Sequence, residues 1–333
     1  MNQREQRQVE IILKKAKRRE RIFLAVAIVA IIGSLFAVYW GKDTIKSAKE
    51  NPYPLIDPGR RFIGQENLIV DFEPLRESLL KLEKDPNYQV GLYFEYLPTG
   101  SNIVVNRDLT LWPASLIKIP VAMAVMKKIE RGQWKLGNEL VLLDEDKDSD
   151  FGTLYQQPTG TRLTIEKLLY ESLVTSDNTA HFILLRNLEE KELADMYDHV
   201  GMDDFLASAF KSSDDYENRM TARQYSRFFR SLYNATYLTP EYSQKFLEIL
   251  TKNSETGLLR GGLPLEVKFA HKTGIRAATE GVYADSGVIF LTGRPYLLTI
   301  MAQAKQGVIE KEAADSLLGD ISKQVYQYVS EYR

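Results

Sequence analysis

The chain has 333 residues, of which 44% are hydrophobic and 11% aromatic, and its net charge is -2. This length and apolar content suffice for one large folded domain or two ordinary ones and exclude a disordered chain. Residues 1–42 contain nine Lys or Arg and three Glu, a net charge of about +6. Residues 43–333 therefore carry a net charge of about -8. That acidic remainder excludes a nucleic-acid-binding protein.

The first feature in chain order is an uncharged stretch of twenty residues, 22–41. It is long enough to cross a hydrocarbon core of about 30 Å and predicts a transmembrane helix. Eight Lys or Arg precede it, so residues 1–21 are expected in the cytoplasm and residues 42–333 outside the cell membrane. The alternative is a cleaved signal peptide, but the stretch ends in Tyr39 and Trp40 and lacks a small-residue cleavage site.

Residues 42–63 are polar and contain three prolines, a composition that predicts an extracytoplasmic linker. The folded domain is therefore expected to span residues 64–333. Cysteine is absent, which rules out disulfides, and a domain with a large core does not need them.

The domain shows strand patterns near both of its ends and helical patterns between them. Residues 69–84 predict a helix, and residues 88–97 and 101–106 predict a hairpin. Helical periodicity follows at 115–131, 164–175, 177–188, 190–199, 221–233 and 239–251. Three strands are predicted within 265–274, 281–293 and 294–305, and a closing helix over 310–332. This order predicts an α+β fold, an antiparallel sheet of about five strands flanked by helices with an inserted helical subdomain.

The apolar run PASLIKIPVAMAVM, residues 113–126, contains one serine and one lysine, Ser115 and Lys118. Their spacing of three places them on one helical face. A desolvated lysine with a lowered pKa can take the proton of a serine and activate it as a nucleophile. Ser-x-x-Lys also occurs by chance in chains of this size, so the pair alone leaves a simple core helix open.

Two further polar clusters interrupt apolar segments. Ser176, Asp177 and Asn178 separate two helical patterns, where a helix cap is the alternative explanation for one of the three residues. Lys272, Thr273 and Gly274 close a predicted strand, where the alternatives are an edge strand protected by a charge or a bulge. All three clusters in this order are much less probable by chance than any one of them.

Together, SLIK at 115–118, SDN at 176–178 and KTG at 272–274 resemble the three motifs of class A β-lactamases and penicillin-binding proteins. The resemblance extends from about Gln89 to the C-terminus. It implies the β-lactamase-like fold and a serine hydrolase that forms an acyl-enzyme. It also implies that the substrate is a β-lactam or a peptidoglycan stem peptide, with no cofactor and no metal.

The resemblance also implies roles for individual residues. Ser115 would be the acylated nucleophile and Lys118 its base, while Ser176 would pass a proton to the leaving nitrogen and Asn178 would hold Lys118 and the substrate amide. Lys272 and Thr273, with Gly274 beside them, would bind the substrate carboxylate. Backbone amides of Ser115 and Ile275 would form the oxyanion hole. Arg260 would add a second positive charge for the carboxylate, with Arg276 as the alternative.

One part of the family pattern is missing from this sequence. Class A β-lactamases carry a loop glutamate that activates water to hydrolyse the acyl-enzyme. The corresponding region, 201–224, lacks the E-x-x-x-N arrangement and offers only Asp214, Asp215 and Glu217, which are more simply read as solvated charges. Three functions therefore stay open: a β-lactamase, a D,D-carboxypeptidase of the cell wall, and a penicillin-binding sensor without turnover.

Other chemistries find no support in the sequence. The three histidines, His181, His199 and His271, are scattered, and no glycine-rich phosphate loop follows a strand. We expect a monomeric domain outside the membrane whose partners are its substrate and, through residues 22–41, the membrane.

Overall fold

The computed structural model describes residues 70–202, 219–276 and 281–331, together with Lys15, Lys17, Leu55 and Ile56. The chain divides into two compact units, Met1–Pro52 and Tyr53–Arg333. In the first unit only Lys15 and Lys17 are described, and both are helical and exposed. None of the helices in the described ranges has the length and apolar composition for a membrane crossing. The predicted span 22–41 lies outside those ranges.

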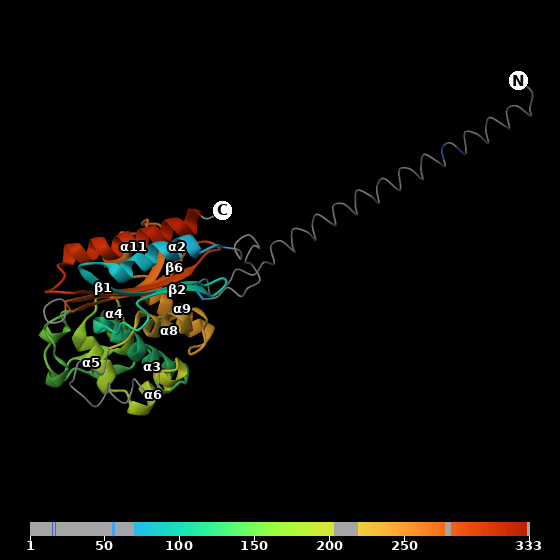
Figure 1. Ribbon diagram of the computed structural model, residues 1–333. Helices are drawn as coiled ribbons and strands as arrows, with labels where there is room; N and C mark the ends of the chain where they lie inside the picture. Colours follow the sequence, from blue (N-terminus) through green and yellow to red (C-terminus); the bar gives the residue numbers. More distant parts are fainter. Residues whose placement is uncertain are drawn as a thin grey trace, which may run out of the picture. The chain divides into compact units, whose positions relative to one another are not determined.

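The second unit is built on a five-stranded antiparallel sheet with strand order β2-β1-β7-β6-β5 (Figure 1). Its strands are β1 (Tyr88–Tyr96), β2 (Ser101–Val105), β5 (Lys268–Arg276), β6 (Val282–Phe290) and β7 (Tyr296–Ala304). Residues from both ends of the domain thus form one sheet, which confirms the predicted α+β fold. β5 lies at one edge, so its outer side is open to contact from the helical subdomain.

Helices cover both faces of the sheet, and the pleat supplies a separate apolar core to each face (Figure 1). Along β6, Ala284 and Val288 face one core while Tyr283 and Ile289 face the other, as the two-residue side-chain period requires. On the second face lie α2 (Glu73–Leu79), its 3₁₀ extension η3 (Leu80–Lys84), α10 (Leu258–Gly261) and α11 (Lys311–Glu331). The long α11 is the predicted closing helix.

The first face carries the helical subdomain. Its elements are η4 (Ala114–Ile117), α3 (Lys118–Glu130), α4 (Ile165–Leu173), α5 (Asn178–Arg186), α6 (Glu190–His199), α8 (Ala222–Tyr233) and α9 (Pro240–Leu250). Side chains fix several helix starts: Thr164 caps α4, Asp177 caps α5, and Thr221 with Gln224 forms a capping box at α8. Each predicted helix of this block is present.

Three small features were not predicted. A two-stranded sheet pairs β3 (Glu139–Val141) with β4 (Arg162–Thr164), and α10 spans only four residues. The short 3₁₀ turns η5 (Asp144–Asp146) and η6 (Leu154–Gln156) lie between β3 and β4. Elements of three or four residues contain too few positions to show an apolar period, so sequence patterns do not reveal them.

Leu55 and Ile56, within the predicted linker, are buried in the core of the second unit, with 2% and 6% exposure. The Leu55 N–H donates to Gln244 Oε1 on α9 at 2.7 Å. The folded unit therefore includes residues that precede the expected start at residue 64.

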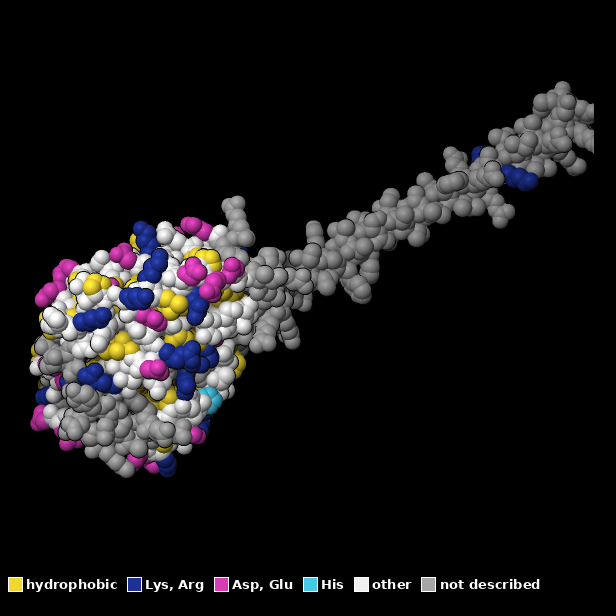
Figure 2. Space-filling view, viewed as in Figure 1, with side chains coloured by type: hydrophobic (Ala, Val, Ile, Leu, Met, Phe, Trp, Pro, Cys, Tyr) yellow, Lys and Arg dark blue, Asp and Glu magenta, His cyan; other side chains and the backbone are white. Residues whose placement is uncertain are grey.

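The surface carries charges of both signs. On the face shown in Figure 2, Lys, Arg, Asp and Glu side chains are interspersed over the described part of the second unit and do not gather by sign.

Candidate active site

Ser115 lies in the short turn η4, directly before α3, and is half-buried. The residue before it, Ala114, has a φ of 49°, a left-handed conformation that non-glycine residues rarely adopt. Gly274 of β5 packs closely against this turn: a Cβ at that position would lie 2.5 Å from the Pro113 carbonyl oxygen. A glycine at position 274 therefore lets the edge strand approach the serine, which gives the third motif a packing role.

Lys118 begins α3 and is 2% exposed. Its Nζ donates to the backbone oxygen of Ser176 and to Asn178 Oδ1 at 2.7 Å, and it lies 3.2 Å from Ser176 Oγ. Burial, and after it the positive charge of Lys272, lowers the pKa of Lys118 to about 6, although Asp177 and Asp148 act in the opposite direction. At neutral pH the amine is therefore mostly uncharged and able to accept a proton.

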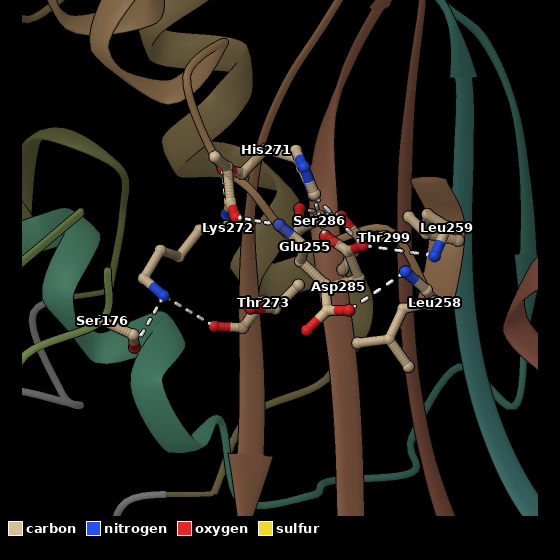
Figure 3. Close-up of polar contacts among 12 residues, drawn as sticks. Ser176, Glu255, Leu258, Leu259, His271, Lys272, Thr273, Asp285, Ser286 and Thr299 are labelled. Atoms are coloured by element: carbon tan, nitrogen blue, oxygen red, sulfur yellow. Dashed lines mark hydrogen bonds and ion pairs between the residues drawn. The ribbon is translucent and has the colours of Figure 1, made fainter. Parts of the chain in front are cut away.

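Ser176 connects the two lysines of the site. It lies between α4 and α5 with a φ of 60°, and its Oγ accepts from Lys272 Nζ at 2.9 Å as well as lying 3.2 Å from Lys118 Nζ. Figure 3 shows Lys272 reaching from β5 toward Ser176, which belongs to the helical subdomain. The hydroxyl thus joins the sheet side of the site to the helical side.

The remaining residues of the second motif hold this loop in place. Asp177 caps α5 by accepting from the Ala180 N–H at 2.8 Å, and its other oxygen accepts from the amides of Thr153 and Leu154 at 2.7 and 2.9 Å. The capping alternative is therefore correct for Asp177. Asn178 accepts from Lys118 and donates to Asp148 Oδ1 at 2.9 Å.

Lys272 is fully buried, so it does not serve as a solvated charge on an edge strand. Its Nζ also donates to the Thr273 carbonyl oxygen at 3.0 Å. Burial lowers the pKa of Lys272 to about 8, and the nearby carboxylates of Asp285 and Glu255 limit the decrease. Lys272 therefore keeps a large cationic fraction at pH 7, in contrast to Lys118.

His271 precedes Lys272 on β5, and its side chain lies on the other face of the sheet (Figure 3). Its Nδ1 lies 3.0 Å from Asp285 Oδ1 of β6, and Asp285 Oδ2 accepts from the Leu259 N–H at 3.2 Å. These buried groups fix β5 and β6 behind Lys272. His181 is also buried, and desolvation lowers its pKa to about 3, so it is neutral and cannot act as an acid near pH 7.

A pocket of ≈ 310 Å³ opens beside Ser115. Of the predicted site residues, Ser115, Ser176, Thr273 and Ile275 line it. Its remaining lining residues are Phe151, Val174, Thr175, Asn253, Ser254 and Glu255. The pocket thus places the candidate nucleophile, the serine that contacts both lysines and the threonine predicted to bind the carboxylate against a single volume.

Arg260 does not lie in this cluster. Its guanidinium donates to the backbone oxygens of Pro264 and Val267, so it holds the loop before β5, and it is not among the residues that line the pocket. The expectation that it binds the substrate carboxylate therefore gains no support. Arg276 lies over the ring of Trp112, 4.8 Å from the ring centroid. The candidate acids Asp214, Asp215 and Glu217 lie outside the described residues.

Asp148 and Glu255 are site residues that sequence reasoning missed. Asp148 orients Asn178, and Glu255 lines the pocket. Both lie in polar loops with no repeating pattern, and a single acidic residue in such a loop is normally a solvated charge. Only the tertiary structure shows that they face the site.

Comparison with known proteins agrees with this geometry. Residues 74–329 match the beta-lactamase enzyme family. Beta-lactamase VEB-1 of Pseudomonas aeruginosa is 24% identical over 271 residues, which cover 75% of this chain and 89% of the relative. Beta-lactamase 3 of Bacillus cereus is 24% identical over 260 residues, covering 75% and 80% of the two chains.

Solved structures share the fold. PBP-A is 22% identical with a TM-score of 0.67, and the match covers 78% of this chain and 97% of that structure. A mutant of PBP-A, solved as an acyl-enzyme complex with penicillin G, gives a TM-score of 0.68 at 22% identity, over 78% of this chain and 97% of that structure. An ancestral class A beta-lactamase gives a TM-score of 0.65 at 24% identity, and the match covers 76% of this chain and 99% of that structure.

Fold, motifs and comparisons define a serine hydrolase of the superfamily that unites class A β-lactamases and penicillin-binding proteins. Within that superfamily, the chain belongs to the beta-lactamase enzyme family.

Proposed function

We propose that this protein is a membrane-anchored, extracytoplasmic hydrolase that forms an acyl-enzyme at Ser115 with β-lactams or with acyl-D-Ala-D-Ala-type amides. The observation that carries the proposal is the placement of Ser176 Oγ between Lys118 and Lys272, at 3.2 and 2.9 Å, beside a pocket that Ser115 lines. One lysine is mostly neutral and the other mostly charged near pH 7.

Acylation follows from these charges. Neutral Lys118 takes the hydroxyl proton of Ser115 as Oγ attacks the amide carbonyl, and the Ser115 and Ile275 amides stabilise the oxyanion. As the carbon–nitrogen bond breaks, Ser176 donates its proton to the leaving nitrogen and recovers one from Lys118. Thr273 and charged Lys272 bind the carboxylate of the substrate. The step forms the Ser115 ester and breaks the carbon–nitrogen bond; a peptide releases its amine as a separate molecule, whereas in an opened β-lactam the amine stays attached to the acyl group.

Release of the acyl group distinguishes the candidate functions. Region 201–224 lacks the family's glutamate arrangement, which favours a long-lived acyl-enzyme and therefore a D,D-carboxypeptidase or another penicillin-binding protein over an efficient β-lactamase. The solved acyl-enzyme of a PBP-A mutant with penicillin G shows that a protein of this fold can hold a penicillin as an ester. A sensor that binds penicillin without turnover would keep the same acylation step.

The test uses the full chain in detergent with a chromogenic cephalosporin and a fluorescent penicillin. Sustained hydrolysis supports a β-lactamase, whereas stoichiometric labelling that persists for hours supports a penicillin-binding protein. Hydrolysis of a D-Ala-D-Ala peptide separates a peptidase from a sensor. Ser115→Ala should abolish labelling. Equal labelling of Ser115→Ala and wild type would contradict the nucleophile assignment.

The proposed topology rests on residues 22–41 and the basic segment before them. It places residues 1–21 in the cytoplasm and the hydrolase domain outside the cell membrane. Protease added to intact cells should therefore degrade the domain. Protection of the domain in intact cells, with degradation after lysis, would overturn this orientation.

A further inference from the structure

Glu255 gives the pocket a negative charge beside the region where a substrate carboxylate would bind. Of the ten described residues that line the pocket, only Glu255 is charged. Its side chain keeps 23% exposure, whereas neighbouring Lys272 is fully buried and is not among the lining residues. Glu255 also lines a second cleft, together with Gly257 and Lys311, so its negative charge lies at the border of the pocket and close to Lys272.

The backbone holds Glu255 in this position. Its N–H donates to Asn253 Oδ1 at 3.0 Å, and Asn253 Nδ2 in turn donates to the His271 carbonyl oxygen of β5 at 3.3 Å. Glu255 Oε1 accepts from the Gly257 N–H at 3.0 Å. The backbone at Glu255 is therefore tied through Asn253 to the strand that carries Lys272 and Thr273, and the Gly257 amide holds the carboxylate.

The charges around Glu255 do not neutralise it fully. Lys311 Nζ lies 3.4 Å from Oε1, but this lysine is 46% exposed and also pairs with Asp315 at 3.1 Å. An exposed and shared cation offsets a carboxylate only weakly. On the other side, Glu255 is close enough to Lys272 to favour its charged form. Glu255, which lines the pocket, and Lys272, which is buried outside its lining, thus form a pair of opposite charges near Thr273.

We propose that Glu255 is a specificity-determining residue that selects substrates in which a cationic group lies next to the carboxylate bound by Thr273. This inference rests on the proposed acylation of Ser115. A ligand with a carboxylate alone is opposed by Glu255. A ligand that carries a cation beside its carboxylate can pair the cation with Glu255 and the carboxylate with Lys272. The preferred substrates are therefore those whose leaving group is zwitterionic.

The experiment compares two cephalosporins that share one acylamino side chain and the ring carboxylate. One carries a pyridiniomethyl group at C3 and the other an acetoxymethyl group. Competition with the fluorescent penicillin on the full-length protein gives the second-order acylation rate of each, and the measured quantity is the ratio of the two rates, cationic over neutral. Comparing this ratio between variants removes the intrinsic difference in reactivity of the two compounds.

Glu255→Gln should lower this ratio by about fivefold, the effect of one partly screened charge pair. Glutamine retains an oxygen that can accept from Gly257, which preserves the loop. Asp320→Asn is the matched control: it removes a nearby acidic charge that is exposed and does not line the pocket, and it should leave the ratio unchanged. Lys311→Met should raise the ratio, because it removes the cation that offsets Glu255.

An unchanged ratio in Glu255→Gln, or an equal fall in Asp320→Asn, would overturn the inference while leaving acylation of Ser115 intact. Failure of both cephalosporins to acylate the wild-type protein would instead overturn the proposed function. If Glu255→Gln does not fold, as judged by its melting curve, the response of Lys311→Met decides, and a ratio that does not rise overturns the inference.

Discussion

The rate at which Ser115 is acylated should depend on pH through both buried lysines. Lys118 must be neutral to act as a base, and its pKa is lowered to about 6 by burial and then by Lys272. The rate should therefore rise with pH through about 6. Lys272 must be charged to bind a carboxylate, and burial lowers its pKa to about 8, so the rate should fall through about 8. The expected profile is a bell with its maximum near pH 7.

The size of the effect follows from the shift of Lys118. A lysine at its ordinary pKa of 10.5 is neutral in about 0.03% of molecules at pH 7, whereas a pKa of about 6 makes about 90% of molecules neutral. Burial thus increases the population of the active base by roughly three thousandfold. Between pH 7 and pH 5 the neutral fraction of Lys118 falls about tenfold, and the acylation rate should fall with it.

The assay measures labelling of the full-length protein by fluorescent penicillin at short times between pH 5 and pH 10. The Asp148→Asn variant tests the assignment of the acidic limb of the pH profile. The Asp148 charge raises the pKa of Lys118, so its removal should move that limb to lower pH. The alkaline limb, which belongs to Lys272, should stay in place. A rate that climbs steadily to pH 10, as an ordinary lysine would produce, would refute the assignment of Lys118 as the base.

Three further substitutions test the packing around the site. Gly274→Ala should lower the labelling rate and reduce the free energy of unfolding by about 1–3 kcal/mol, because its Cβ would clash with the Pro113 carbonyl. Gly137→Ala is the control: its Cβ would meet no atom within 4 Å, so neither the labelling rate nor the melting temperature should change. Asp177→Ala removes the acceptor of three backbone amides and should cost about 2–4 kcal/mol; a loss below about 0.5 kcal/mol would contradict this role. Leu55→Ala should cost about 2–4 kcal/mol in the same assay, and an unchanged melting temperature would show that this segment adds nothing to the fold.

Four of the five strands of the large sheet could be predicted because they consist mostly of β-branched, aromatic or aliphatic side chains between turn residues, whereas β5 (KFAHKTGIR) has fewer of them. The helices could be predicted because each presents an apolar stripe to the sheet or to its neighbours. Two of the predicted helices contain a 3₁₀ segment: η3 ends the helix predicted over 69–84, and the turn that contains Ser115 precedes α3. Periodicity cannot detect the turn at Ser115, because it spans only four residues and packs against Gly274 of β5, which is distant in the sequence.

Some residues of the candidate site could likewise be predicted from the sequence, and others could not. The members of the three motifs could be predicted because two lysines in apolar surroundings require partners, and serine, asparagine and threonine supply them. Arg260 shows the limit of that reasoning. Its guanidinium lies near a motif in the sequence but donates its hydrogen bonds to backbone oxygens. Asp148 and Glu255 reach the site only through loops whose path depends on the assembled fold.

The placement of acidic groups explains why two similar lysines take different roles. Lys118 and Lys272 share Ser176 Oγ, and two ammonium groups so close together repel strongly where water is excluded. One of them must lose its proton. Asp285 lies behind Lys272 and Glu255 beside it, and both favour its charge, whereas burial and the charge of Lys272 together outweigh the acids near Lys118. In the proposed mechanism the carboxylates therefore place the base on the helical side of the site and the anion-binding cation on the sheet side, with Ser176 as the proton carrier between the base and the leaving nitrogen.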